Sequence, residues 1–287
     1  MKSKTFTDKK ILLLGSTGML GTGIEKVCRR RNIPCIGITH KQLEITNINQ
    51  LNDVIKRFMP EVIINTVAIP GIEQCELEPR RAFDINSIAV LNLAKICEKN
   101  NVTLMQISSS SVFDGTKDGF YTEEDNVNPT GIYAASKYIA ECFVRNICSK
   151  YYIIRLSTLF GKRRNKGARF VDKAIEKIKN GEEIRVAADR TDSPTYTIDA
   201  ANAIISLMDI EPYGICHIAN SGKTSYYNFT KKLAEMIGGN AKIIKAKENE
   251  FKSIAYKPLN LALKSIKLNP LRRWEDALHD FVIKELK

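Results

Sequence analysis

Apolar positions recur along the first 160 residues in two alternating patterns. Short apolar runs predict β-strands at KILLLG, IPCIGI, VIINTVA, VTLMQIS and YYIIRLS. The stretches between them place apolar residues three and four positions apart, which predicts helices at about 18–31, 49–58, 79–99 and 129–149. Strands that alternate with helices are typical of repeated βαβ units. The pattern therefore predicts an α/β fold with a doubly wound, mostly parallel, Rossmann-like sheet.

The pattern loosens after residue 160. A basic loop precedes a predicted helix near 168–179 and a strand at EIRVA, and DRTDSPTYTID leads into a helix that ends near Asp209. GICHIAN predicts a further strand, and YYNFTKKLAEMIG and RRWEDALHDFVIKEL predict helices. We therefore expect an NAD(P)-binding domain over 1–160 and a smaller, closely packed substrate-binding lobe over 161–287, from which some segments return to the main sheet.

Composition and charge narrow the class of protein. No apolar run reaches the roughly 18 residues of a membrane span, and the polar N-terminus has no signal core, so we expect a cytoplasmic protein. The seven cysteines are scattered without a metal-binding spacing, which predicts reduced thiols and no metal site. The net charge of +12 is spread along the chain, which disfavours nucleic acid as a partner. The densest basic clusters, at 29–31 and 162–164, suit solvated surface or the attraction of a small anionic ligand.

A glycine turn follows the first predicted strand. Gly15, Gly18 and Gly21 lie three residues apart, directly before a helical stretch. Glycines there permit a tight turn and let a pyrophosphate approach the helix N-terminus, whose dipole and free N–H groups favour its charge. The three-and-three spacing resembles that of the extended short-chain dehydrogenases.

The end of the second strand bears on which dinucleotide binds. An NAD-selective fold usually places a carboxylate there against the ribose 2′-hydroxyl. This chain has His40 and Lys41 instead, and its nearest carboxylate, Glu44, comes later. Together with the arginines at 29–31, these two residues would suit a 2′-phosphate, so NADP(H) is favoured over NAD(H).

A tyrosine and a lysine stand four residues apart, at Tyr133 and Lys137, on one face of a predicted helix. A lysine cation favours the phenolate and lowers the phenol pKa, so such a tyrosine can give a proton to a carbonyl oxygen while hydride reaches the carbon. Ser109 ends the fourth strand, where open α/β sheets bind ligands, and its hydroxyl could donate to the same oxygen. The combination predicts ketone reduction, although each motif alone is common.

The chain resembles the dTDP-4-dehydrorhamnose reductase family, within the extended short-chain dehydrogenases, over nearly its whole length. The motifs that carry the resemblance are GSTGMLG, LEITN, VIINTVA with IEQCELEP, FDINSIAVLNLA, SSSSVFDG, NPTGIYAASKYIAE, IRLSTLFG, ADRTDSPTYTIDAA and RRWEDALHDF. The resemblance implies a lobe closing over a nucleotide sugar, a homodimer as the usual assembly, and catalytic roles for Ser109, Tyr133 and Lys137. It places further cofactor contacts at Gly15, Met19, Leu20, Gly21, Asn65, Val67, Ala68 and Asn86.

Departures from the family pattern fall beside the substrate. The reductases usually have Thr-Asp-Tyr where this chain has Ser109, Ser110 and Ser111, and a tryptophan where it has Thr158. We expect Ser110, Ser111 and Thr158 to contact substrate and to change the shape of the pocket. The predicted activity is NADPH-dependent reduction of the 4-keto group of a nucleotide-linked deoxysugar. A non-catalytic dinucleotide-binding regulatory subunit and a nucleotide-sugar epimerase are the alternatives, and a dehydratase would need an acid pair that Ser110 and Ser111 lack.

Overall fold

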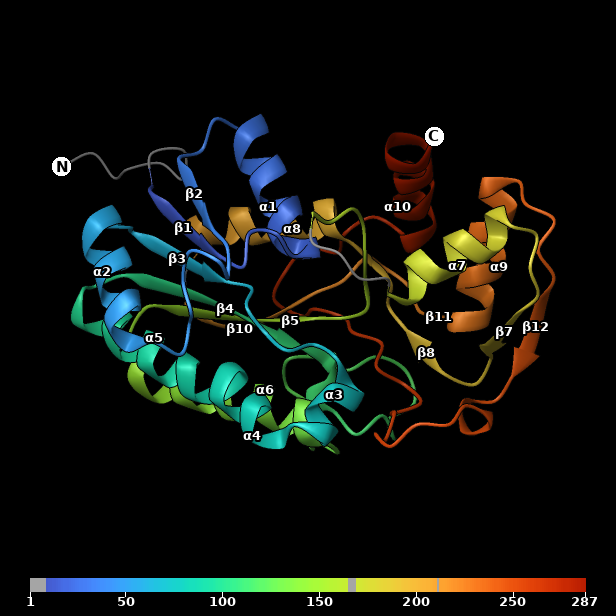
Figure 1. Cartoon of the computed structure of the whole chain (residues 1–287), viewed down its shortest axis with the longest axis horizontal. Helices are drawn as coiled ribbons and strands as arrows, with labels where there is room; N and C mark the ends of the chain where they lie inside the picture. Colours follow the sequence, from blue (N-terminus) through green and yellow to red (C-terminus); the bar gives the residue numbers. More distant parts are fainter. Residues whose placement is uncertain (1–8, 165–168, 211) are drawn as a thin grey trace.

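A six-stranded parallel sheet forms the centre of the molecule (Figure 1). The computed structural model describes residues 9–164, 169–210 and 212–287. Neighbouring strands follow the order β10-β5-β4-β3-β1-β2. Their bounds are β1 Ile11–Leu14, β2 Cys35–Ile38, β3 Val62–Asn65, β4 Thr103–Ser109, β5 Tyr151–Leu156 and β10 Gly214–Ile218. The predicted α/β class and the parallel, Rossmann-like sheet are confirmed.

Helices cover both faces of this sheet, because its strands are apolar on both sides. On one face, a buried cluster that includes Leu12, Leu51, Val90 and Val144 joins the strands to three helices. These are α2 Ile48–Phe58, α5 Ala89–Lys99 and α6 Ile132–Ile147. Within the described ranges, no helix is both long and apolar enough to cross a membrane.

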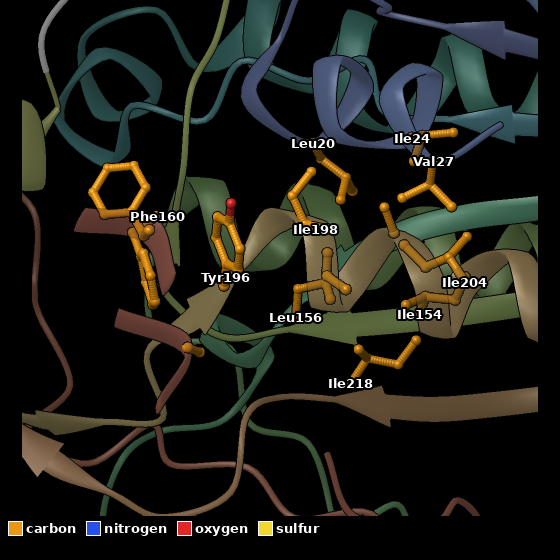
Figure 2. Close-up of a cluster of buried hydrophobic side chains, with 14 of the residues drawn as sticks. Leu20, Ile24, Val27, Ile154, Leu156, Phe160, Tyr196, Ile198, Ile204 and Ile218 are labelled. Carbon is orange, nitrogen blue, oxygen red and sulfur yellow. The ribbon is translucent and has the colours of Figure 1, made fainter. Parts of the chain in front are cut away.

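The other face carries α1 (Met19–Arg30) and α8 (Thr197–Ser206). Figure 2 shows Leu20 and Ile24 of α1 close to Ile198 and Ile204 of α8, with side chains of β5 and β10 beneath them. Gly23 allows the two helices to meet, since a Cβ there would lie 3.0 Å from the carbonyl oxygen of Thr197. This packing holds the N-terminal turn of α1 at the edge of the sheet.

The helical stretch predicted over 79–99 is confirmed in its bounds, but it is not one regular α-helix. A short helix α3 (Ile72–Leu77) precedes α4 (Pro79–Phe83), and a π-helical turn over Asp84–Ile88 then leads into α5. The π-turn inserts an extra residue into the helical repeat, which apolar spacing alone does not reveal. It carries Asn86.

Beyond residue 160 the chain forms a smaller layered group at one side of the sheet (Figure 1). The predicted strand β7 (Ile184–Ala187) and helices α7 (Phe170–Lys179), α9 (Tyr226–Ile237) and α10 (Trp274–Phe281) are present, and the predicted position 168 lies outside the described residues. The unpredicted strand β12 (Ile243–Ala246) pairs with β7. Short pairs join β8 (Thr191–Asp192) to β11 (Thr224–Ser225) and β6 (Leu159–Phe160) to β9 (Thr195–Tyr196). A π-helical turn over Val282–Leu286 follows α10, while α8 and β10 return to the main sheet.

Candidate active site

The glycine turn between β1 and α1 leaves no room for a side chain at Gly15 or Gly21. Gly15 has φ +80°, and its N–H donates to Ile38 O at 3.0 Å. A Cβ on Gly15 would lie 2.7 Å from Thr66 Oγ1, and one on Gly21 would overlap the Gly15 carbonyl oxygen. Gly18 is the N-cap of α1 and no side chain caps the helix, so its first N–H groups remain available to a ligand. The turn therefore fits a pyrophosphate.

Met19 and Leu20 open α1 directly after this turn. Leu20 is buried in the core that α1 shares with α8, whereas Met19 is half-buried. Both residues thus fix the start of the helix whose N–H groups face the turn.

One of the two basic clusters meets the glycine turn, and it is not the expected one. Arg164 donates from Nη2 to Ser16 O at 2.9 Å and from its backbone N–H to Thr17 O at 3.2 Å, and it pairs with Glu25. The arginines at 29–31 lie at the opposite end of the 12-residue helix α1, roughly 18 Å away. Arg31 there donates to Asn202 of α8 at 2.7 Å. The expectation that this cluster helps to hold a 2′-phosphate is wrong.

His40 and Lys41 lie in an exposed turn directly after β2. The turn is held by Thr39, whose N–H and hydroxyl both donate to Gln42 Oε1. Because β1 and β2 are paired along their length, this turn and the glycine turn share one edge of the sheet. Both side chains thus have solvent access beside the turn that fits a dinucleotide.

The end of β3 is organised by two buried amides. Asn65 donates to Gln106 Oε1 at 2.8 Å and accepts the N–H of Val67 at 3.1 Å. Asn86 accepts the N–H of Ile69 at 2.8 Å and donates to Ile69 O at 3.1 Å. Both asparagines are fully buried, so here they shape the backbone that presents the half-buried Val67 and Ala68.

Ser109, Tyr133 and Lys137 come together at the carboxyl end of β4. Ser109 is the last residue of that strand, and its hydroxyl acts on the phenol of Tyr133, which lies in the first turn of α6. The Ser109 hydroxyl donates to Ser111 Oγ at 3.1 Å. Lys137 is one turn further along α6, and its ammonium donates to Ile107 O at 2.6 Å. The helix thus brings phenol and ammonium to the strand end that bears the hydroxyl.

Burial dominates the electrostatics of the pair. It raises the pKa of the Tyr133 phenol, while the Ser109 hydroxyl and the Arg169 guanidinium act against that rise. Burial also lowers the pKa of Lys137 to about 8, against the attraction of the Glu141 carboxylate. The pKa of the phenol is thus raised and not lowered as the sequence predicted, and Lys137 is not among the groups that shift it. The phenol is therefore protonated near neutral pH, the form that a proton donor requires.

A carboxylate from another helix fixes the start of α6. Gly131 is the N-cap of α6 and no neighbouring side chain caps it. Glu76 of α3 instead accepts the N–H of Ile132 at 2.8 Å. Sequence reasoning missed Glu76, because the contact joins residues 56 positions apart.

The three residues expected to contact substrate differ in their surroundings. Ser110 is only 3% exposed, whereas Ser111 is half-buried, with its N–H 3.1 Å from Ser109 Oγ. Thr158, just beyond β5, donates to the buried Asp192 and lies 2.9 Å from the Tyr226 hydroxyl. Thr158, Asp192 and Tyr226 thus form a polar group of side chains just beyond β5. Sequence reasoning did not identify Asp192 or Tyr226 as candidate site residues.

A parallel sheet with a glycine turn at its first strand, and with serine, tyrosine and lysine gathered at the end of its fourth, defines a short-chain dehydrogenase. The chain belongs to the family described as RmlD substrate binding domain, which its residues 9–286 match. It is 29% identical to the Bacillus subtilis spore coat polysaccharide biosynthesis protein SpsK, over 95% of this chain and 96% of that protein. It is also 29% identical to a dTDP-4-dehydrorhamnose reductase from Aggregatibacter actinomycetemcomitans, over 90% of this chain and 92% of that one.

Solved structures agree with this assignment. A dTDP-4-dehydrorhamnose reductase from Clostridium acetobutylicum matches with a TM-score of 0.92 at 30% identity, over 97% of this chain and 100% of that chain. The Bacillus anthracis dTDP-4-dehydrorhamnose reductase in complex with NADP matches with a TM-score of 0.92 at 31% identity, over 96% and 99%. The predicted resemblance to this reductase family is confirmed.

Proposed function

We propose that this chain uses NADPH to reduce the 4-keto group of a nucleotide-linked deoxysugar. The observation that carries the proposal is the placement of the Ser109 hydroxyl and the Tyr133 phenol at the carboxyl end of β4, one helical turn from the buried Lys137. This arrangement puts a hydroxyl donor and a protonated phenol at one point, as a developing alkoxide requires. Relatives named as dTDP-4-dehydrorhamnose reductases, one of them solved with NADP, support the substrate class and the cofactor.

Ser109, Tyr133 and Lys137 each have a separate role in the proposed reaction. When bound, NADPH supplies the hydride that reaches the carbonyl carbon. Ser109 donates a hydrogen bond to the carbonyl oxygen, and Tyr133 transfers its phenolic proton to that oxygen as negative charge develops. Lys137 holds a ribose hydroxyl and stabilises the phenolate that remains.

Other residues of the chain bind the cofactor and the substrate. The turn from Gly15 to Gly21 holds the pyrophosphate, while His40 and Lys41 attract the 2′-phosphate that distinguishes NADPH from NADH. Ser111 and Thr158 face the sugar, and their hydroxyls favour a polar substituent. A cytoplasmic location and a homodimer stay predictions from the sequence.

The test is NADPH oxidation, followed by absorbance, with dTDP-4-dehydrorhamnose and other nucleotide-linked 4-ketosugars. Tyr133→Phe should lower kcat by roughly 10²–10⁴-fold with little change in NADPH affinity, because it removes only the acidic proton. Tyr138→Phe is the matched control, since Tyr138 lies on the same helix and packs against an apolar cluster. A near-normal rate in Tyr133→Phe would refute the mechanism. Tight NADPH binding without turnover would favour a regulatory subunit, and interconversion of sugar epimers would favour an epimerase.

A further inference from the structure

A series of hydrogen bonds leads from Tyr226 to a buried carboxylate beside the end of β5. The Thr158 hydroxyl hydrogen bonds with Asp192 of β8, and it lies 2.9 Å from the phenolic oxygen of Tyr226 on α9. Asp192 is 4% exposed, whereas Thr158 and Tyr226 are half-buried. Leu156 pairs with Ser109 across β5 and β4. Thr158 is therefore two residues along the chain from the position that pairs with the proposed catalytic serine.

The carboxylate of Asp192 sets the direction of these hydrogen bonds. Besides Thr158, it accepts the hydroxyl of Ser157 and, at 2.9 Å, the N–H of Ser193. Burial raises the pKa of the Asp192 carboxyl, while these hydroxyls and a nearby guanidinium act against that rise. Donors on both oxygens favour the ionised carboxylate, which can only accept. Since Thr158 donates its one proton to Asp192, it accepts the phenolic proton of Tyr226.

The phenolic oxygen of Tyr226 is therefore an acceptor toward any ligand. Its proton is committed to Thr158, and within residues 9–164, 169–210 and 212–287 this oxygen has no second hydrogen-bond partner. Two neighbours hold the ring: Phe170 packs edge-on with the ring centres 5.0 Å apart, and the guanidinium carbon of Arg190 lies 4.8 Å from the ring centre. The acceptor is thus fixed in place before a substrate binds.

Thr158, Asp192 and Tyr226 line a small cavity with largely apolar further walls. These walls are formed by Phe170, Val171, Pro194, Thr224, Ser225 and Phe229. The cavity has a volume of about 10 Å³, which is room for about one water molecule. A single hydroxyl fits this space, whereas an acetamido group is too large. The guanidinium of Arg190 beside the Tyr226 ring disfavours an ammonium, so a hydroxyl is the donor that suits both size and charge.

We propose that Thr158, Asp192 and Tyr226 select a nucleotide-linked 4-ketosugar with a free ring hydroxyl, whose O–H donates a hydrogen bond to Tyr226. The inference rests on the proposed function, because it concerns the sugar that the reductase takes. A 6-deoxy-4-ketohexose has two such hydroxyls, on C2 and C3, and one of them enters the cavity. An acetamido group at that position excludes the sugar. These three side chains determine specificity and take no part in hydride or proton transfer.

The test compares kcat/KM for a nucleotide-linked 6-deoxy-4-ketohexose with kcat/KM for its 2-deoxy and 3-deoxy analogues, in the natural chain and in Tyr226→Phe. In the natural chain, loss of the hydroxyl that enters the cavity should lower kcat/KM by about tenfold or more. In Tyr226→Phe the same loss should change kcat/KM by about twofold or less, because no acceptor remains. Taking this ratio in both enzymes cancels differences in the intrinsic reactivity of the ketones. Tyr227→Phe is the matched control, since Tyr227 is the next residue of α9 and does not line the cavity.

The deoxyfluoro analogue at the same ring position tests the direction of the hydrogen bond, because fluorine is close to a hydroxyl in size and cannot donate. Tyr226→Phe should lower its kcat/KM no more than it lowers that of the deoxy sugar. A fluoro analogue that loses as much as the hydroxyl sugar would overturn the proposal. So would a Tyr226→Phe enzyme that loses kcat/KM equally on the parent sugar and on both deoxy analogues.

Two further measurements keep the inference separate from folding and from the proposed function. If Tyr226→Phe does not fold, Thr158→Val frees the phenolic proton and should weaken the same preference for the hydroxyl, and an unchanged preference would overturn the proposal. Absence of turnover on every ketosugar in the natural chain would count against the proposed function. The Kd values of the same sugars, measured by calorimetry, would then either show the hydroxyl preference and its loss in Tyr226→Phe or overturn the inference.

Discussion

Removing the Asn86 amide should destabilise the fold more than it weakens cofactor binding directly. The side chain is fully buried and makes two hydrogen bonds with the Ile69 backbone and one, at 3.0 Å, to Ser136 Oγ. In Asn86→Ala all three partners lose this bond inside the protein. At about 0.5–1.5 kcal/mol for each, the free energy of unfolding should fall by roughly 2–4 kcal/mol. Because Ser136 stands between Tyr133 and Lys137 on α6, kcat should fall as well.

Urea unfolding measures the first effect, and an NADPH titration of the folded variant measures the second. Asn52→Ala is the matched control, since its exposed amide makes one bond to Ile48 O and its loss should cost less than about 0.5 kcal/mol. The reasoning would be refuted if the free energy of unfolding of Asn86→Ala lies within about 1 kcal/mol of that of the natural chain while its NADPH Kd rises more than about tenfold. The amide would then serve the cofactor, as the family resemblance implies.

Three further outcomes are expected. Lys41→Asp should weaken NADPH far more than NADH in fluorescence titrations, because repulsion replaces attraction to the 2′-phosphate; equal effects would make Lys41 ordinary surface. Glu76→Ala leaves the Ile132 N–H uncapped and should cost about 1 kcal/mol in urea unfolding and lower kcat, and an unchanged stability would contradict the capping role. Burial lowers the pKa of His217 to about 4, so the unfolded imidazole takes up a proton below about pH 6.5 that the folded one does not. The free energy of unfolding should therefore fall by about 3 kcal/mol between pH 6.5 and pH 4. Urea unfolding at both pH values should show a much smaller fall for His217→Asn.

The sequence predicted those parts of the fold that depend on local pattern. The apolar runs located all six strands of the sheet, and the glycine spacing located the turn at Gly15, since a tight turn with positive φ leaves few alternatives to glycine. Helical spacing placed Tyr133 and Lys137 on one face, and the glycine turn and Ser109 made the pair a candidate site. Ser109 followed from its place at the end of a strand.

Features that depend on contacts between distant residues were not predicted. The arginines at 29–31 looked close to the cofactor in sequence, yet the length of α1 separates them from the glycine turn. Glu76 and Glu141 read as ordinary charged helix positions, and only the packing of α3, β4 and β5 against α6 gives them partners. The helix α3 has six residues, too few for the helical repeat to appear.

The place of β10 beside β5 bears on how the chain folds. Gly214 pairs with Tyr152 in the sheet, so one side of β5 stays open until the chain has passed through α7, β7 and α8. Long-range parallel pairing of this kind is slow to form, and an unpaired apolar strand edge invites association with other chains. During synthesis, the edge formed by Tyr151–Leu156 is thus the segment most in need of protection. Substitutions that slow the arrival of Gly214–Ile218 should lower the yield of folded protein without altering a single residue of the active site.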